Sequence, residues 1–168
     1  MKALVVYESM FGNSETIAQA VADGLADRFD VTLADARSMP RAAGVDVVVV
    51  GGPTHAFGLS RPATREDAVR QGATRTGVAE VGLREWLDTA PDFPRDTIGA
   101  AFDTSIGKPL TGSAGRKALR RLRRKGCRAA LPAMSFHVTG VAGPLVAGER
   151  ERARRWGEAV AEAVGDRD

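Results

Sequence analysis

The sequence predicts an α/β fold, an open three-layer sandwich built around a five-stranded parallel sheet in the order 2-1-3-4-5. Apolar runs rich in Val, Leu and Ala alternate along the chain with longer segments whose apolar residues recur at helical spacing. The first and third runs are almost continuously apolar, which indicates central strands buried on both faces. The fifth run contains Pro132, and a residue without an N–H group belongs on an edge strand. Two central strands and a fifth strand at the edge fit the doubly wound order.

The expected strands follow these apolar runs along the chain. They are Lys2 to Tyr7, Asp30 to Ala36, Val45 to Gly51, Thr97 to Asp103 and Cys127 to Phe136. Four apolar stripes at helical spacing predict four helices. The stripes consist of Ile17, Ala18, Val21, Ala22 and Leu25; of Leu83, Trp86, Leu87 and Ala90; of Ala118, Leu119 and Leu122; and of Ala153, Trp156, Val160 and Val164. The last three helices end near Pro91, Gly126 and Gly165, and one further short helix is expected over Ala63 to Arg70.

Length and composition limit the protein class. A chain of 168 residues with 43% hydrophobic content is long enough for one buried core and short for two, so a single domain over residues 1–168 is expected. No apolar run approaches the ~20 residues of a membrane span and no signal segment opens the chain, which predicts a cytoplasmic protein. Cys127 is the only cysteine and there are two histidines, so neither an internal disulfide nor a metal site is expected.

The charge is distributed unevenly along the chain. The segment from Thr104 to Gly148 holds nine of the 24 basic residues and no acidic one, which leaves 15 basic and 21 acidic residues elsewhere. Seven of the nine lie between Arg116 and Lys125, on the solvent side of the third apolar stripe. A concentrated positive charge of this kind produces an electric field that favours binding of some partners over others. It suits an acidic redox partner, an anionic membrane surface or the phosphates of a nicotinamide cofactor; nucleic acid is not expected, because no stacking aromatics or recognition motif accompany it.

The loop from Glu8 to Ser14 is the first candidate for a binding site. In an open α/β sheet, ligands bind beyond the carboxyl ends of the strands, near the point where the strand order reverses. Gly12 permits an unusual backbone turn, and Ser9, Asn13 and Ser14 offer hydrogen-bonding side chains at the start of the first helix. The free N–H groups and dipole of a helix N-terminus favour a phosphate. An ordinary helix cap is the alternative, because Asn and Ser are preferred capping residues.

The run VVYESMFGNSETIAQAV, residues 5–21, resembles the N-terminal signature of the flavodoxin family. An apolar pair, an aromatic residue, a hydroxyl residue, a small residue, a second hydroxyl and then Ala with an aliphatic residue follow the family order. Ser14 stands where the family usually has Thr. The resemblance implies bound flavin mononucleotide (FMN). The residues implied to wrap its phosphate are Ser9, Met10, Phe11, Gly12, Asn13 and Ser14.

Two further loops are expected to border the flavin ring. The loop after the third strand resembles the flavin loop of flavodoxins and of flavodoxin-like quinone reductases; its candidate residues are Pro53, Thr54, His55, Phe57 and Gly58. Stacking by His55 or Phe57 competes with a surface imidazole and with packing of the loop on itself. The loop after the fourth strand contributes Asp103, Thr104, Ser105 and Gly107. Many flavodoxins carry a tyrosine there, whereas the only tyrosine of this chain is Tyr7.

Three functions share this fold, and the fold alone does not separate them. The favoured one is an FMN-binding electron carrier that works with a separate redox protein, docked on the basic helix from Arg116 to Lys125. The first alternative is an FMN-dependent NAD(P)H:quinone oxidoreductase, and the second is a flavin-free interaction module. The glycine-rich segment from Phe136 to Pro144 is interpreted as a surface loop leading to the last helix, with a mobile rim of the site as the alternative.

Overall fold

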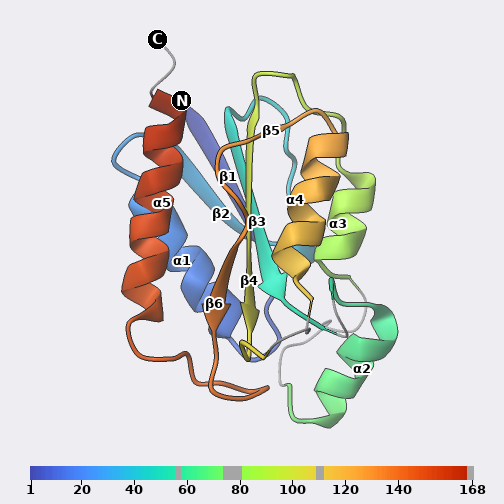
Figure 1. The fold of residues 1–168 in the computed structure, drawn as a ribbon. Helices are drawn as coiled ribbons and strands as arrows, with labels where there is room; N and C mark the ends of the chain where they lie inside the picture. Colours follow the sequence, from blue (N-terminus) through green and yellow to red (C-terminus); the bar gives the residue numbers. More distant parts are fainter. Residues whose placement is uncertain (56–57, 74–80, 109–111, 166–168) are drawn as a thin grey trace.

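The computed structural model describes residues 1–55, 58–73, 81–108 and 112–165, which form one parallel sheet with helices on both faces (Figure 1). The strands are β1 (Lys2–Tyr7), β2 (Asp30–Asp35), β3 (Val47–Pro53), β4 (Ile98–Ser105), β5 (Arg128–Ala129) and β6 (Met134–His137). The helices are α1 (Asn13–Leu25), the 3-10 turn η1 (Ala36–Ser38), α2 (Pro62–Arg70), α3 (Leu83–Thr89), α4 (Ala114–Arg124) and α5 (Glu149–Gly165).

The predicted strand order is confirmed. The sheet runs β2-β1-β3-β4-β5 with every pairing parallel, and β6 also pairs with β4. The expected fifth strand, Cys127 to Phe136, is instead two short strands separated by residues 130–133. Pro132 lies in that interval, and its missing N–H group and fixed φ interrupt the ladder. β5 and β6 both sit at the edge beside β4, as the proline predicts.

The two faces of the sheet bury separate apolar clusters. Along β1, Ala3, Val5 and Tyr7 join the cluster under α1 and α5, whereas Leu4 and Val6 join the cluster under α3 and α4. Side chains of a strand alternate between faces, so burial of both sets makes β1 and β3 central, as their continuous hydrophobicity predicts. Both tryptophans are buried, Trp156 in the first cluster and Trp86 in the second.

The helix boundaries also follow the predicted signals. α4 ends before Gly126, whose φ of +104° is the left-handed conformation of a glycine after a helix. α2 begins at Pro62, one residue earlier than expected. Cys127 is buried, and this burial raises the pKa of its thiol to about 12. Within the described residues, no helix is long and apolar enough to cross a membrane, and no three His, Cys, Asp or Glu side chains gather as a metal site.

Candidate functional site

A cavity opens beyond the carboxyl ends of β1, β3, β4 and β6. Four segments that are distant in sequence line it. The lining residues are Ser9, Met10, Phe11, Asn13, Ser14, Pro53, Thr54, His55, Thr104, Ser105, Ile106, Val138 and Val141. The structure therefore brings residues of all three predicted loops to one cavity and adds a fourth segment. Phe57 is not among the described residues.

The turn before α1 forms one wall of the cavity. Gly12 has a φ of +95°, and its N–H group donates a hydrogen bond to Ser9 Oγ at 3.0 Å. Its carbonyl accepts from Thr16 N and Thr16 Oγ1. Gly12 is the N-cap residue of α1 and, as a glycine, supplies no side-chain cap, so neither Asn13 nor Ser14 serves as the ordinary helix cap that the sequence allows. An anion can accept hydrogen bonds from the first N–H groups of a helix.

A buried hydrogen bond joins this turn to the loop after β4. Ser14 Oγ and Thr104 Oγ1 lie 2.8 Å apart, and both residues are buried. Thr54 links the loop after β3 to the same place, because its N–H donates to the Thr104 carbonyl and its hydroxyl accepts from Ala114 N at the start of α4. The protein's own hydrogen bonds thus hold three loops together, which lowers the ordering cost of ligand binding.

His55 brings a polar atom without a partner to the cavity wall. Its backbone is fixed by hydrogen bonds in both directions, from His55 N to the Gly58 carbonyl (2.7 Å) and from Gly58 N to the His55 carbonyl (2.8 Å). His55 Nε2 is buried and has no hydrogen-bond partner among the described residues. Burial, and then the positive charge of Arg65, lower the pKa of the imidazole. A buried polar atom without a partner is stabilised by any group that can hydrogen-bond to it.

Four predicted residues do not line the cavity. Gly12 provides the left-handed backbone of the turn before α1, Gly58 lies against the Lys117 side chain, and Gly107 faces the His137 ring. Asp103 is fully buried, and its Oδ2 accepts hydrogen bonds from Ser113 Oγ and from Gly115 N at 3.0 Å. This oxygen therefore anchors the start of α4, whereas Asp103 Oδ1 is buried with no hydrogen-bond partner among the described residues. The cofactor contact of Asp103 stays a prediction.

The fourth segment, between β6 and α5, has the sequence of a surface loop. Val138 pairs with Leu145 and Thr139 N donates to the Pro144 carbonyl, which folds the segment back on itself. Its exposed Val141 (55%) and Ile106 of the loop after β4 (41%) both line the cavity. Aliphatic side chains that stay exposed at a cavity mouth are suited to cover an apolar ligand. The only sequence signal for Val141 is an apolar residue inside a glycine-rich loop.

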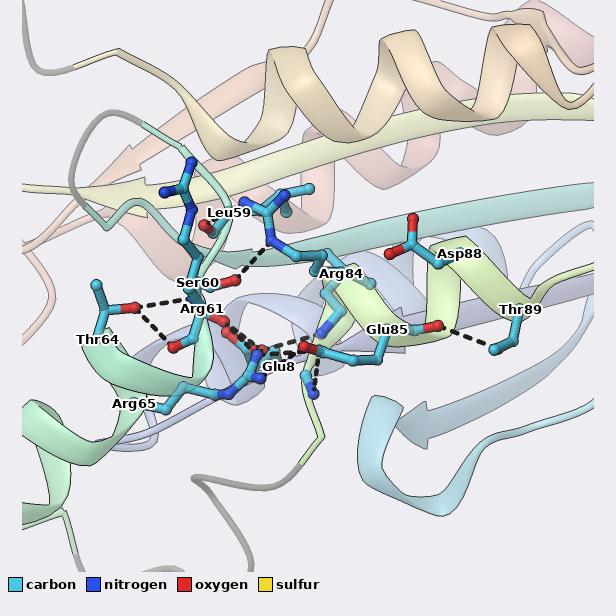
Figure 2. Close-up of polar contacts among 12 residues, drawn as sticks. Glu8, Leu59, Ser60, Arg61, Thr64, Arg65, Arg84, Glu85, Asp88 and Thr89 are labelled. Atoms are coloured by element: carbon cyan, nitrogen blue, oxygen red, sulfur yellow. Dashed lines mark hydrogen bonds and ion pairs between the residues drawn. The ribbon is translucent and has the colours of Figure 1, made fainter.

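A buried ionic network joins Glu8, beside the cavity residue Ser9, to side chains of α2 and α3 (Figure 2). Glu8, the residue after β1, accepts hydrogen bonds at Oε1 from Ser60 Oγ (2.7 Å) and Leu83 N (2.9 Å). Arg65 of α2 is completely buried, lies 3.6 Å from the same oxygen, and donates two hydrogen bonds to Glu85 of α3 (2.7 and 3.0 Å). The network connects the turn before α1 and the end of the loop after β3 to helices α2 and α3.

The pKa values of the two carboxyl groups in this network shift in opposite directions. Burial is the main cause for Glu8. Burial raises the pKa of Glu8. The hydrogen bonds from Ser60 and Leu83 and the positive charge of Arg65 lower it, but their combined effect is smaller. For Glu85, partial burial is outweighed by hydrogen bonds from Arg65 and from backbone N–H groups, so its pKa lies below the usual value. Arg65 therefore stabilises the charged form of Glu85 more than that of Glu8, because its contacts with Glu85 are shorter.

Comparison with known proteins places the chain in a family. The sequence model of the flavodoxin family matches residues 5–93. The chain belongs to the flavodoxin family. No curated protein sequence matches it. Family membership implies a flavin cofactor. A glycine at the N-cap of α1 and a buried His55 Nε2 with no partner among the described residues are features that fit such a ligand.

Solved structures share the flavodoxin fold over almost the whole chain. A flavodoxin from the domain Archaea is 20% identical, with a TM-score of 0.68 over 98% of this chain and 99% of that one. Oxidised Flavodoxin 1 from Bacillus cereus is 17% identical, with a TM-score of 0.69 over 96% and 98%. The Flv1 flavodiiron core from Synechocystis is 18% identical, with a TM-score of 0.65 over all of this chain and 37% of that one. At sequence identities of 17–20%, the structural similarity establishes the fold alone.

Proposed function

We propose that the protein binds FMN in this cavity and carries electrons to or from a separate redox protein. The observation that carries the proposal is the N-terminus of α1 at the cavity wall, where the N-cap residue is the left-handed Gly12 with no side chain to cap the helix. A terminal phosphate dianion suits such a site better than the internal diphosphate of FAD, since the dianion concentrates charge where the N–H groups converge. When bound, the flavin would supply the redox chemistry.

The residues of the chain would position and shield this cofactor. Ser9 and Asn13 would flank the phosphate, and His55 Nε2 would gain the hydrogen-bond partner that it lacks. Met10, Ile106 and Val141 would cover apolar parts of the ligand. The Ser14–Thr104 hydrogen bond would keep the loops at the right separation.

An FMN titration of the purified protein tests this function. We expect stoichiometric quenching of FMN fluorescence, weaker binding of FAD, and no oxidation of NAD(P)H until a reductase is added. A protein that leaves FMN fluorescence unchanged would refute the proposal and favour the flavin-free interaction module.

Quinone reduction is the second candidate function. The observation that favours it is the exposure of Ile106 and Val141 at the cavity mouth, where no tyrosine of the described residues closes the site. A planar substrate can reach a flavin through such an opening. Rapid NAD(P)H oxidation with a quinone acceptor and no added reductase would establish this activity in place of the carrier.

The bound flavin is expected to have a less negative reduction potential than flavins surrounded by acidic residues. No acidic residue lines the cavity within the described part of the chain, so negative charge gained on reduction meets no carboxylate there. We expect Ile106→Glu to make the potential more negative by tens of millivolts, since a nearby like charge costs roughly 1–4 kcal/mol and 1.4 kcal/mol is about 30 mV for two electrons. Ile106→Gln, with the same shape and no charge, is the control. Equal potentials for the two variants would contradict the argument.

A further inference from the structure

The outer side of α4 carries a row of basic side chains. Its members, here called the basic face, are Arg116, Arg120, Arg123 and Arg124. All four are exposed, and none forms an ion pair with a described residue. Of the other three basic residues between Arg116 and Lys125, Arg121 pairs with Asp88, Lys125 donates to the Ala90 carbonyl, and Lys117 lies against Gly58. The basic face is therefore the part of this basic segment that is left for an external partner.

Helix α5 differs from α4, because three of its four arginines form ion pairs within the helix. Its Arg152 pairs with Glu149, Arg154 with Glu151 and Glu158, and Arg155 with Glu151. On α4, by contrast, like charges stand three and four residues apart, and no acidic residue occupies the first turn. Like charges at these spacings destabilise a helix. A surface with complementary negative charge would offset this repulsion.

The basic face begins at the proposed flavin site. The first turn of α4 donates a hydrogen bond from Ala114 N to Thr54 Oγ1, and Thr54 lines the cavity. One turn further on, the Lys117 side chain packs against Gly58 of the loop after β3. A protein docked along the basic face would therefore lie beside the cavity mouth.

We propose that the basic face docks a carboxylate-rich surface of the redox partner, an inference that rests on the proposed carrier function. Arg116 and Arg124 are eight residues apart, about 12 Å along the helix, which matches an extended acidic surface better than one diphosphate. The apolar residues of α4, Ala118, Leu119 and Leu122, are buried against the sheet, so this helix has no free apolar face to insert into a membrane. It presents no aromatic residue to stack on nucleic-acid bases.

Cytochrome c offers a matched pair of probes, because native cytochrome c is basic and its fully succinylated form is acidic. In each assay, ferric haem takes one electron from the reduced holoprotein and becomes ferrous. We expect succinylated cytochrome c to be reduced at least 10-fold faster than the native form at low salt, within the range of electrostatic steering. The advantage should vanish near 1 M salt, where the Debye length is about 3 Å.

A quadruple variant, R116Q/R120Q/R123Q/R124Q, tests the residues. Its control, R28Q/R41Q/R95Q/R150Q, removes the same charge from exposed arginines on other segments. We expect the first variant to lose at least 10-fold in rate with succinylated cytochrome c and the control less than 2-fold. Equal rates for the two variants would overturn the proposal.

Binding without electron transfer separates failure of this proposal from failure of the proposed function. Calorimetry with the flavin-free protein should show the same loss of affinity for succinylated cytochrome c in the first variant, even if the protein takes up no FMN. Anionic phosphatidylserine vesicles or duplex DNA are the competing ligands. If the vesicles or the DNA bind through the four arginines and succinylated cytochrome c does not bind, the proposal that the partner is a protein is overturned.

Discussion

Replacing Arg65 by Met is expected to lower the free energy of unfolding by about 3–5 kcal/mol, the range for removal of one partner from a buried ion pair. The Arg65 side chain is completely buried between Glu8 and Glu85. Without it, the Glu8 carboxylate remains inside the protein and loses its ion pair with Arg65, while Ser60 loses one hydrogen bond and Glu85 loses two. Urea denaturation at pH 7 measures the loss.

Arg70→Met on the same helix is the matched control. Arg70 pairs with Asp67, but their side chains are 73% and 58% exposed, and an exposed pair contributes at most about 1 kcal/mol. The two variants remove the same charge and the same group. A loss for Arg65→Met as small as that for Arg70→Met would show that the buried network contributes little to stability.

The pH dependence provides an independent check of the same network. Because burial raises the pKa of Glu8 above its unfolded value of about 4.5, the native state holds this proton more tightly than the unfolded state. The stability due to that proton is present below pH 4.5 and is lost as pH rises through the raised pKa. Removing Arg65 raises the Glu8 pKa further, so the deficit of Arg65→Met should be smaller at pH 5 than at pH 8.

The sheet was predictable because its signals are local. Continuous apolar runs identify β1 and β3 as central strands, and each helix stripe reports its own buried face. The edge strand was only partly predictable. Pro132 indicated an edge position correctly, but how far one proline interrupts the pairing depends on the neighbouring strand, and here β4 accepts two short partners, β5 and β6, instead of one.

The ionic network was not predictable in the same way. Arg65 lies in a polar stretch that has the composition of an exposed segment, and its partners Glu8 and Glu85 are 57 and 20 residues away. Burial of a charged side chain depends on which segments the fold brings together, and composition does not reveal it. The same reason explains Val141: its place at the cavity follows from the folding back of residues 138–145 toward β4, which leaves no periodic pattern in the sequence.

Gly12→Val is expected to weaken FMN binding by about 100-fold or more while changing riboflavin binding much less. The φ of Gly12 is +95°, a conformation in which a β-branched residue is strongly disfavoured. Relaxing the turn would move the first N–H groups of α1 away from the phosphate. Hydrogen bonds to charged groups contribute about 1.5–3 kcal/mol each, so losing two costs at least a factor of 100 at 1.4 kcal/mol per tenfold. Riboflavin has the same ring and no phosphate.

The control for backbone strain is Gly44→Val. Gly44 also has a positive φ, +70°, and a Cβ atom added to it would meet nothing within 4 Å. It lies before β3, at the end of that strand remote from the cavity. Both variants therefore introduce valine into a left-handed turn and should be destabilised to a similar extent, but only Gly12→Val should change the ratio of FMN to riboflavin affinity. If Gly12→Val weakens both ligands equally, the turn before α1 supports the site as a whole and does not hold the phosphate. A selective loss of FMN affinity would place the phosphate at the N-terminus of α1, because riboflavin differs from FMN in that group alone.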